Sequence, residues 1–211
     1  MNEEPHNPEL ERLQEFIALR KQVNLGTDAE TEKRIQENPH PTDEEILIGA
    51  FREMIDPQVR DALFEFYHKG YNTECSGFCG KYGEIQSIDG YFEIDENTKR
   101  KIEALGGKIL KGKDFGIPYQ SEQYTYVTFK PTTASLKEMK KKWNEIANIL
   151  PEKAELVQPS ISGGGETFRK RFAPERTDIE KSMLQRRLAM TNQFSPEMQK
   201  EMQERLLGLS N

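Results

Sequence analysis

Apolar and polar positions between Gly83 and Ser160 switch several times between a period near two and a period near 3.6. From residue 87 to 94 the even positions are apolar or glycine and the odd positions are polar or tyrosine, which predicts a strand with one buried face. Tyr124 to Lys130 predicts a second long strand, with Val127 and Phe129 on its inner face. Short strands are predicted at 108–111 and 155–158.

Two helices are predicted between these strands. Asp95 can cap a helix that ends at Gly106, and Ser135 with Glu138 fits a capping box that starts a helix ending before Pro151. The resulting order, β-α-β-β-α-β, predicts an α+β fold with a ferredoxin-like antiparallel sheet in which the first and third strands are central. The alternative is a different antiparallel sheet that also uses Tyr71 to Cys79.

The same periodicity predicts which side chains form the core. We expect the inner faces of the two long strands and the apolar stripe of the second helix to pack together. The predicted core residues are Phe92, Ile94, Val127, Phe129, Trp143 and Ile146.

The segments on either side of this region are predicted to be mainly helical. Asn7 and Pro8 begin a first helix. The polar composition of 24–41 indicates a linker that can hold a weak helix near 29–36. Two further helices are predicted between Thr42 and Gly70. Beyond Pro159, a glycine hinge precedes two short helices near 178–190 and 196–207. We therefore divide the chain into an N-terminal helix and linker (1–41), a core domain (42–160) and a flexible hinge with a helical C-terminal arm (161–211).

Composition indicates that the chain does not bury all of itself, because 35% of the residues are hydrophobic and 31% are charged. The net charge is −6, and residues 1–61 carry 15 Asp/Glu against 7 Lys/Arg. No apolar run is long enough to cross a bilayer, and the acidic start does not resemble an export signal. We expect a soluble, cytoplasmic protein with no membrane partner.

The outer face of the predicted sheet carries three tyrosines and two carboxylates: Asp89, Tyr91, Glu93, Tyr124 and Tyr126. Aromatic rings on a four-stranded sheet can stack RNA bases, but the carboxylates would repel phosphates. Alternating carboxylates usually mark a solvated face, and tyrosines in this position usually lie under a packed helix, here the pair between Thr42 and Gly70. A deep pocket with a shifted carboxylate at these residues would favour a small-molecule site.

A second candidate surface is the basic start of the arm. Between Phe168 and Leu188 there are 7 Lys/Arg and 3 Asp/Glu in an otherwise acidic chain. Such a cluster can bind RNA or an acidic protein surface, fold back on the acidic N-terminal part, or simply be a solvated tail. The candidate binding residues here are Phe168, Arg169, Lys170, Arg171, Arg186 and Arg187.

The sequence shows no combination of residues typical of an enzyme. Cys75 and Cys79 are the only cysteines and match no structural zinc pattern, so we expect ordinary reduced thiols. The run Gly163 to Gly165 lacks the flanking strand and Lys-Ser/Thr of a phosphate loop, and we expect it to be a hinge. We therefore predict no catalytic residue, no metal site and no cofactor.

The function that these patterns favour is that of a non-enzymatic binding or adaptor protein. It would dock a protein partner, or a second copy of itself, through the C-terminal arm and the sheet face, because short amphipathic helices are marginal unless packed against something. The first alternative is association with RNA or a ribonucleoprotein through the basic arm. The second is a small-molecule-binding domain or an enzyme that uses the tyrosine and carboxylate face.

Overall fold

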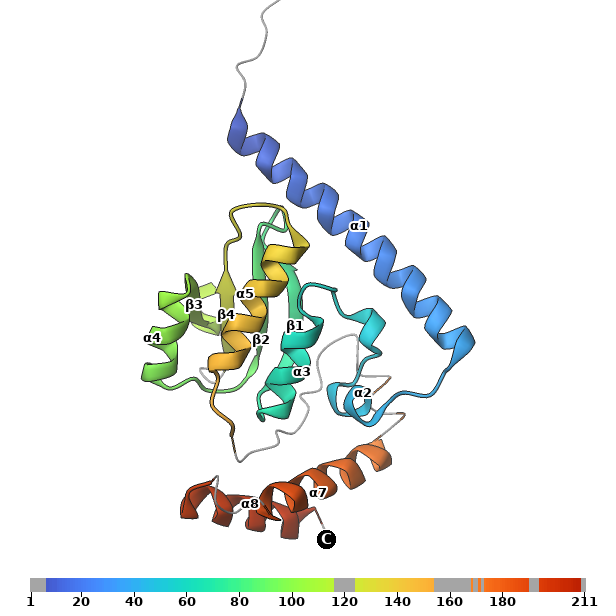
Figure 1. Ribbon diagram of the computed structural model, residues 1–211, viewed down its shortest axis with the longest axis vertical. Coiled ribbons are helices and arrows are strands. Elements are labelled where there is room, and N and C mark those ends of the chain that lie inside the picture. Colours follow the sequence, from blue (N-terminus) through green and yellow to red (C-terminus); the bar gives the residue numbers. More distant parts are fainter. Residues whose placement is uncertain are drawn as a thin grey trace, which may run out of the picture.

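The computed structural model describes residues 7–115, 124–153, 168, 171, 173–189 and 194–209. Within them the chain is an α+β structure built on a four-stranded antiparallel sheet (Figure 1). The strands in their spatial order are β1 (Asn72–Cys79), β2 (Ile85–Tyr91), β4 (Tyr124–Phe129) and β3 (Gly107–Lys111).

The ferredoxin-like strand order is not the one observed. β2, α4 (Glu96–Ala104), β3, β4 and α5 (Leu136–Ile149) follow the predicted succession, and the two long strands β2 and β4 are central as expected. The place beside β2 is taken by β1, which precedes it in the chain and reaches it through a short turn. The alternative prediction, in which the segment from Tyr71 to Cys79 joins the sheet, is confirmed by β1. The predicted last strand at 155–158 lies outside the described residues.

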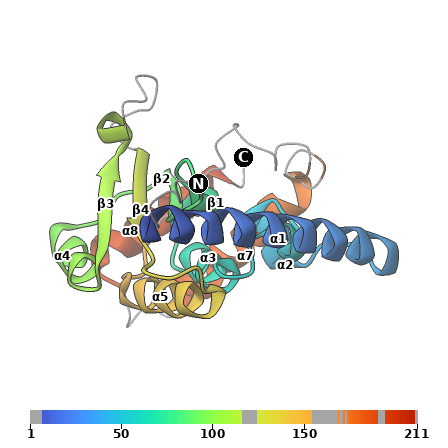
Figure 2. The same cartoon turned by 90° about the horizontal axis from the view of Figure 1, so that it is seen from above.

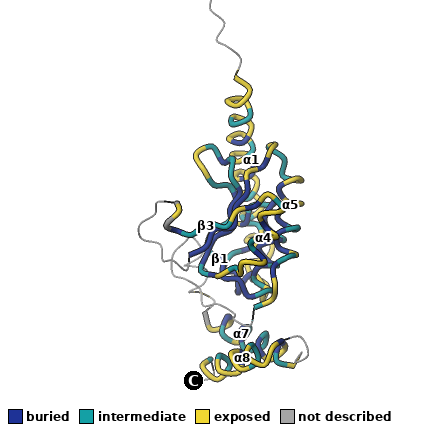
Figure 3. Tube along the Cα trace, turned by 90° about the vertical axis from the view of Figure 1, so that its left-hand side faces the viewer, coloured by how far each residue is buried: buried dark blue, intermediate teal, exposed yellow. Residues whose placement is uncertain are grey.

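Three helices cover one face of the sheet. α3 (Arg60–His68) and α4 both contact α5. Figure 2 shows the three helices on the same side of the strands, and Figure 3 shows this for α4 and α5. The sheet and its helices share one core, in which Trp143, Ile88 and Val127 are completely buried. All six predicted core residues belong to it, although Ile94 is only half-buried.

The N-terminal helix is longer than predicted. α1 (Pro8–Glu37) runs without a break through most of the segment that we expected to be a linker with only a weak helix near 29–36. Its side chains Phe16 and Val23 are buried against the rest of the protein, and its Glu30 pairs with Arg60 at 2.7 Å. Contacts with the rest of the protein therefore stabilise a polar sequence as a helix, which local composition does not reveal.

The short helix α2 (Asp43–Ile48) follows and joins α1 to the domain. It begins with a capping box: the Thr42 hydroxyl accepts from the amide of Glu45, and the Glu45 carboxylate accepts from the amide of Thr42. Glu45 is 2% exposed and also pairs with Arg34 of α1 at 2.9 Å. It accepts a further bond from the amide of Arg52, in the short helix η1 (Arg52–Met54).

The C-terminal arm contributes α7 (Ala173–Ala189) and α8 (Pro196–Gly208), which lie together at one end of the molecule (Figure 1). They share a small apolar cluster of their own around Leu184, Phe194 and Met202, while α7 also contacts α2. Among the described helices, none combines the length and the apolar character needed to cross a bilayer.

Candidate functional site

The first candidate surface is the sheet face opposite the helices, which we call the tyrosine face. Asp89 pairs with Tyr126 and Tyr91 pairs with Tyr124 in the register of β2 and β4, so these four side chains share that face. Glu93 does not join them, because it lies beyond the end of β2 and is exposed. The structure thus brings together four of the five residues predicted here.

Asp89 is the chemically unusual residue of this face. Its side chain accepts hydrogen bonds from the Tyr124 hydroxyl at 2.9 Å and the Ser87 hydroxyl at 3.3 Å, and the residue is only 7% exposed. Burial raises the pKa of Asp89 to about 6, and Glu74 nearby adds to the rise, although the two hydroxyl donors oppose it. The prediction of a solvated carboxylate face is therefore wrong for Asp89.

The three tyrosines form an aromatic row rather than an open stacking platform. The rings of Tyr91 and Tyr124 meet edge to face with centroids 5.0 Å apart, and those of Tyr124 and Tyr126 are 5.2 Å apart. Tyr124 and Tyr126 are buried, so only Tyr91 presents a partly accessible ring. The predicted cover is also wrong, because α3 packs on the opposite face with Ile88 and Val127.

The cysteines of β1 lie near this face but form no described metal site. Cys75 pairs with Asp89 in the strand register and is exposed, and both Cys75 and Cys79 are free thiols. Two strand positions four residues apart are about 13 Å from each other, which is too far for a disulfide. Within the described ranges, no three His, Cys, Asp or Glu side chains are grouped so as to hold a metal ion.

The second candidate surface, the basic start of the arm, is partly used inside the protein. Arg187 is 8% exposed and donates to the carbonyl of Lys153 at 2.7 Å and to the carbonyl of His68, the last residue of α3. Burial lowers the pKa of its guanidinium. A cation in this position satisfies the His68 carbonyl, which the end of α3 leaves without an amide partner.

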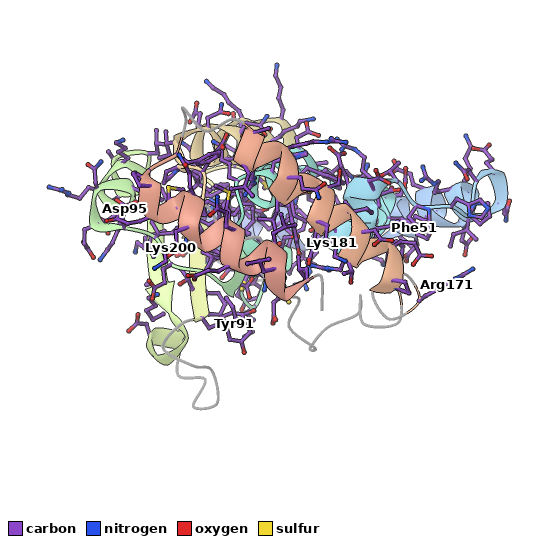
Figure 4. The ribbon with its side chains drawn as sticks, turned by 90° about the horizontal axis from the view of Figure 1, so that it is seen from below. Phe51, Tyr91, Asp95, Arg171, Lys181 and Lys200 are labelled. Atoms are coloured by element: carbon purple, nitrogen blue, oxygen red, sulfur yellow. The ribbon has the colours of Figure 1, made fainter. Side chains whose placement is uncertain are left out.

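Phe168 is a second point of attachment, since its ring meets that of Phe51 edge to face at 5.0 Å. In Figure 4, Arg171 and Phe51 lie at the same end of the arm, whereas Tyr91 lies apart from both arm helices. Arg171 and Arg186 are exposed. Arg169 and Lys170 lie outside the described residues.

Where the arm meets the domain there is a cleft of about 670 Å³, which we call the arm cleft. α2 and the end of α3 form one wall, and α7 forms the other, so the cleft exists only because the arm is docked. Its lining residues are Asp43, Glu44, Leu47, His68, Glu152, Asp178, Ile179, Ser182, Met183, Arg186, Arg187 and Phe194.

Sequence reasoning did not find this cleft. The sequence shows the apolar residues of α2 and of α7 separately. It does not show that Leu47 of α2 and Ile179 and Met183 of α7 line the same cleft. Of the described residues predicted for binding, Arg186 and Arg187 line the cleft and the others do not. The tyrosine face and the arm cleft are therefore separate candidate sites.

Charges are distributed unevenly around the arm cleft. Glu44 is bonded to the His68 ring at 2.7 Å. Asp43, Glu152 and Asp178 form no salt bridge with the described part of the chain, and neither does Arg186. Among the described residues, the lining thus holds four carboxylates and two guanidinium groups, and one of the guanidinium groups is the buried Arg187.

Comparison with known protein families, curated proteins and solved structures finds no match for this chain.

Proposed function

We propose that the chain is a non-enzymatic binding protein that holds a segment of a partner protein in the arm cleft. The observation that carries this proposal is the cleft itself, which has a volume of about 670 Å³ and walls from two separately packed parts of the chain. Ligand sites in proteins have similar volumes and occur preferentially between such parts. Met183 in the wall favours a partner segment, since methionine adapts its shape to the side chains that it contacts.

The arm then serves as a wall of the binding site rather than as a free docking element. Arg187 and the contact between Phe168 and Phe51 hold it on the domain at two places. This arrangement gives less support to RNA as the partner. Arg187 donates its hydrogen bonds to two backbone carbonyls, and Arg176 is buried in a salt bridge of 3.1 Å with Glu180. Phosphate contacts need accessible cations.

The test is methyl NMR on full-length protein with labelled methionines, using a panel of short peptides of varied charge and small organic fragments. Met183 reports on the arm cleft, and Met54, which is 46% exposed on η1, reports on unrelated surface. We expect some panel members to shift the Met183 signal in a saturable way and to leave Met54 unchanged.

Two variants of one cleft residue provide the control. Ser182→Trp should fill the space and abolish the Met183 response, whereas Ser182→Ala should retain it. The proposal fails if no panel member shifts the Met183 signal, or if saturable binding survives the tryptophan.

A small-molecule site on the tyrosine face is the second candidate function, favoured by the buried Asp89 with its raised pKa and its bond from Tyr124. Perturbed carboxyl groups are concentrated at functional sites, although structural networks also produce them. The same panel tests this candidate through the carboxyl carbon signal of Asp89, with the exposed Asp95 as the reference. Ligands that move only the Asp89 signal would favour this face over the arm cleft.

A further inference from the structure

We infer that the partner segment is cationic and amphipathic, with apolar side chains that enter the arm cleft and Lys or Arg residues that meet its rim. The inference rests on the proposed function and names the chemistry of the partner. It follows from the contrast between the floor of the cleft and its edge.

The floor of the arm cleft is apolar. Leu47 and Phe194 are at most 9% exposed, and Ile179 and Met183 are half-buried beside them. Phe194 and Met183 also belong to the apolar cluster between α7 and α8, so the arm side of the floor is part of a packed unit. An occupant gains affinity here by burying apolar side chains.

The rim of the arm cleft is acidic and comes from three separate parts of the chain. Asp43 lies in the first turn of α2, Asp178 lies on α7, and Glu152 follows α5. All three are exposed and without salt bridges among the described residues. The charge of Asp43 also stabilises the start of α2, but that role does not account for Asp178 or Glu152.

Among the described lining residues, Arg186 is the one exposed arginine at the rim. Arg187 lines the cleft as well, but its guanidinium is directed to the carbonyls of His68 and Lys153. An acidic partner would therefore face three exposed carboxylates with one accessible arginine to pair with. Of the three, Glu152 also interacts electrostatically with the buried Arg187, so Asp43 and Asp178 carry most of the contrast. A basic partner would find complementary charge on both walls, which increases its association rate and its specificity.

Three capped nine-residue peptides test the inference with the full-length protein. The first combines Leu and Phe with four Lys or Arg residues, the second carries Glu at each charged position, and the third carries Gln. Calorimetry gives the affinities at low and high salt, and the Met183 methyl signal locates the binding. We expect the cationic peptide to bind in the arm cleft more tightly than the neutral one, and to lose affinity as salt is added.

Matched triple variants separate the rim from the overall charge. Asp43→Asn, Glu152→Gln and Asp178→Asn together should weaken the cationic peptide by at least about threefold, since exposed ion pairs contribute modestly. The control, Glu15→Gln with Glu32→Gln and Glu103→Gln, removes three exposed carboxylates on α1 and α4 and should leave the affinity nearly unchanged.

Each other outcome overturns the inference in a recognisable way. If the acidic or neutral peptide binds the arm cleft as tightly, the cationic assignment is wrong and the proposed function stands. Equal losses in both triple variants would mean that only net charge matters. If none of the three peptides shifts the Met183 methyl signal but other members of the panel do, the partner chemistry is wrong. If no member of the panel shifts that signal, the proposed function is refuted as well.

Discussion

Asp89 should make the protein less stable as the pH rises, and Asp89→Asn should remove that effect. The carboxyl group has a pKa of about 6 in the folded protein and an ordinary value of 3.8. The folded state therefore binds the proton more tightly than the unfolded state does. Stability from this group is complete below pH 3.8 and is lost as the pH rises toward 6. The loss amounts to about 3 kcal/mol above that pH.

The assay is urea unfolding between pH 4 and pH 7.5, followed by the fluorescence of Trp143. This residue is the only tryptophan and is completely buried in the core, so its emission should report global unfolding. Titrations common to both proteins cancel in the difference between wild type and Asp89→Asn. We expect the free energy of unfolding of wild type, relative to the variant, to fall by about 2.5 kcal/mol across this range, because a small part of the loss has already occurred at pH 4.

Glu93→Gln is the matched control, because it removes a nearby carboxylate that is exposed and outside the hydrogen-bond network. It should follow the wild-type profile. Tyr124→Phe removes a donor that stabilises the ionised carboxylate, so it should raise the pKa of Asp89 further and extend the loss of stability to higher pH. Parallel profiles for wild type and Asp89→Asn would refute the reasoning.

Three further substitutions test the packing. Phe129→Ala should cost roughly 3–5 kcal/mol in urea unfolding, because the ring packs 5.0 Å from that of Trp143; a nearly unchanged midpoint would contradict its core position. Arg187→Met should free two carbonyls and speed proteolysis of the arm, whereas the exposed Arg186→Met should not. Gly77→Ala should lower the melting temperature, since φ is 110° and a Cβ would lie 2.1 Å from the Asp56 carboxylate; an unchanged temperature would show that this contact relaxes easily.

The faces of the central strands could be predicted because a buried strand needs apolar residues at every second position. Ile88 of β2 and Phe92 just beyond its end meet this requirement, as do Val127 and Phe129 of β4, and all four are in the core. The edge strand β1 was only an alternative, since it contains Glu74, Ser76 and Gly77, and a short hairpin turn rather than apolar spacing positions it.

Charged residues are where the sequence was least informative. Asp89 and Arg187 have the same local appearance as exposed neighbours such as Glu93 and Arg186, yet each is buried by residues distant in the chain. The arm cleft was hidden for the same reason, because its two walls are more than a hundred residues apart in sequence. Periodicity describes one element at a time and does not show which elements meet.

The buried carboxylate of Glu45 has a consequence for the order in which the N-terminal part opens. It binds Arg34 of α1, the start of α2 and the amide of Arg52, so detaching the C-terminal end of α1 would leave a buried charge without its cation. The other end of α1 begins with an exposed asparagine cap, and its first turns are linked to the domain by the hydrogen bond from Arg12 to the Pro131 carbonyl at 3.4 Å, which involves no buried charge. Backbone amides of the first turns of α1 should therefore exchange with solvent by local fraying, whereas those around Arg34 and α2 should exchange together in a single, rarer opening.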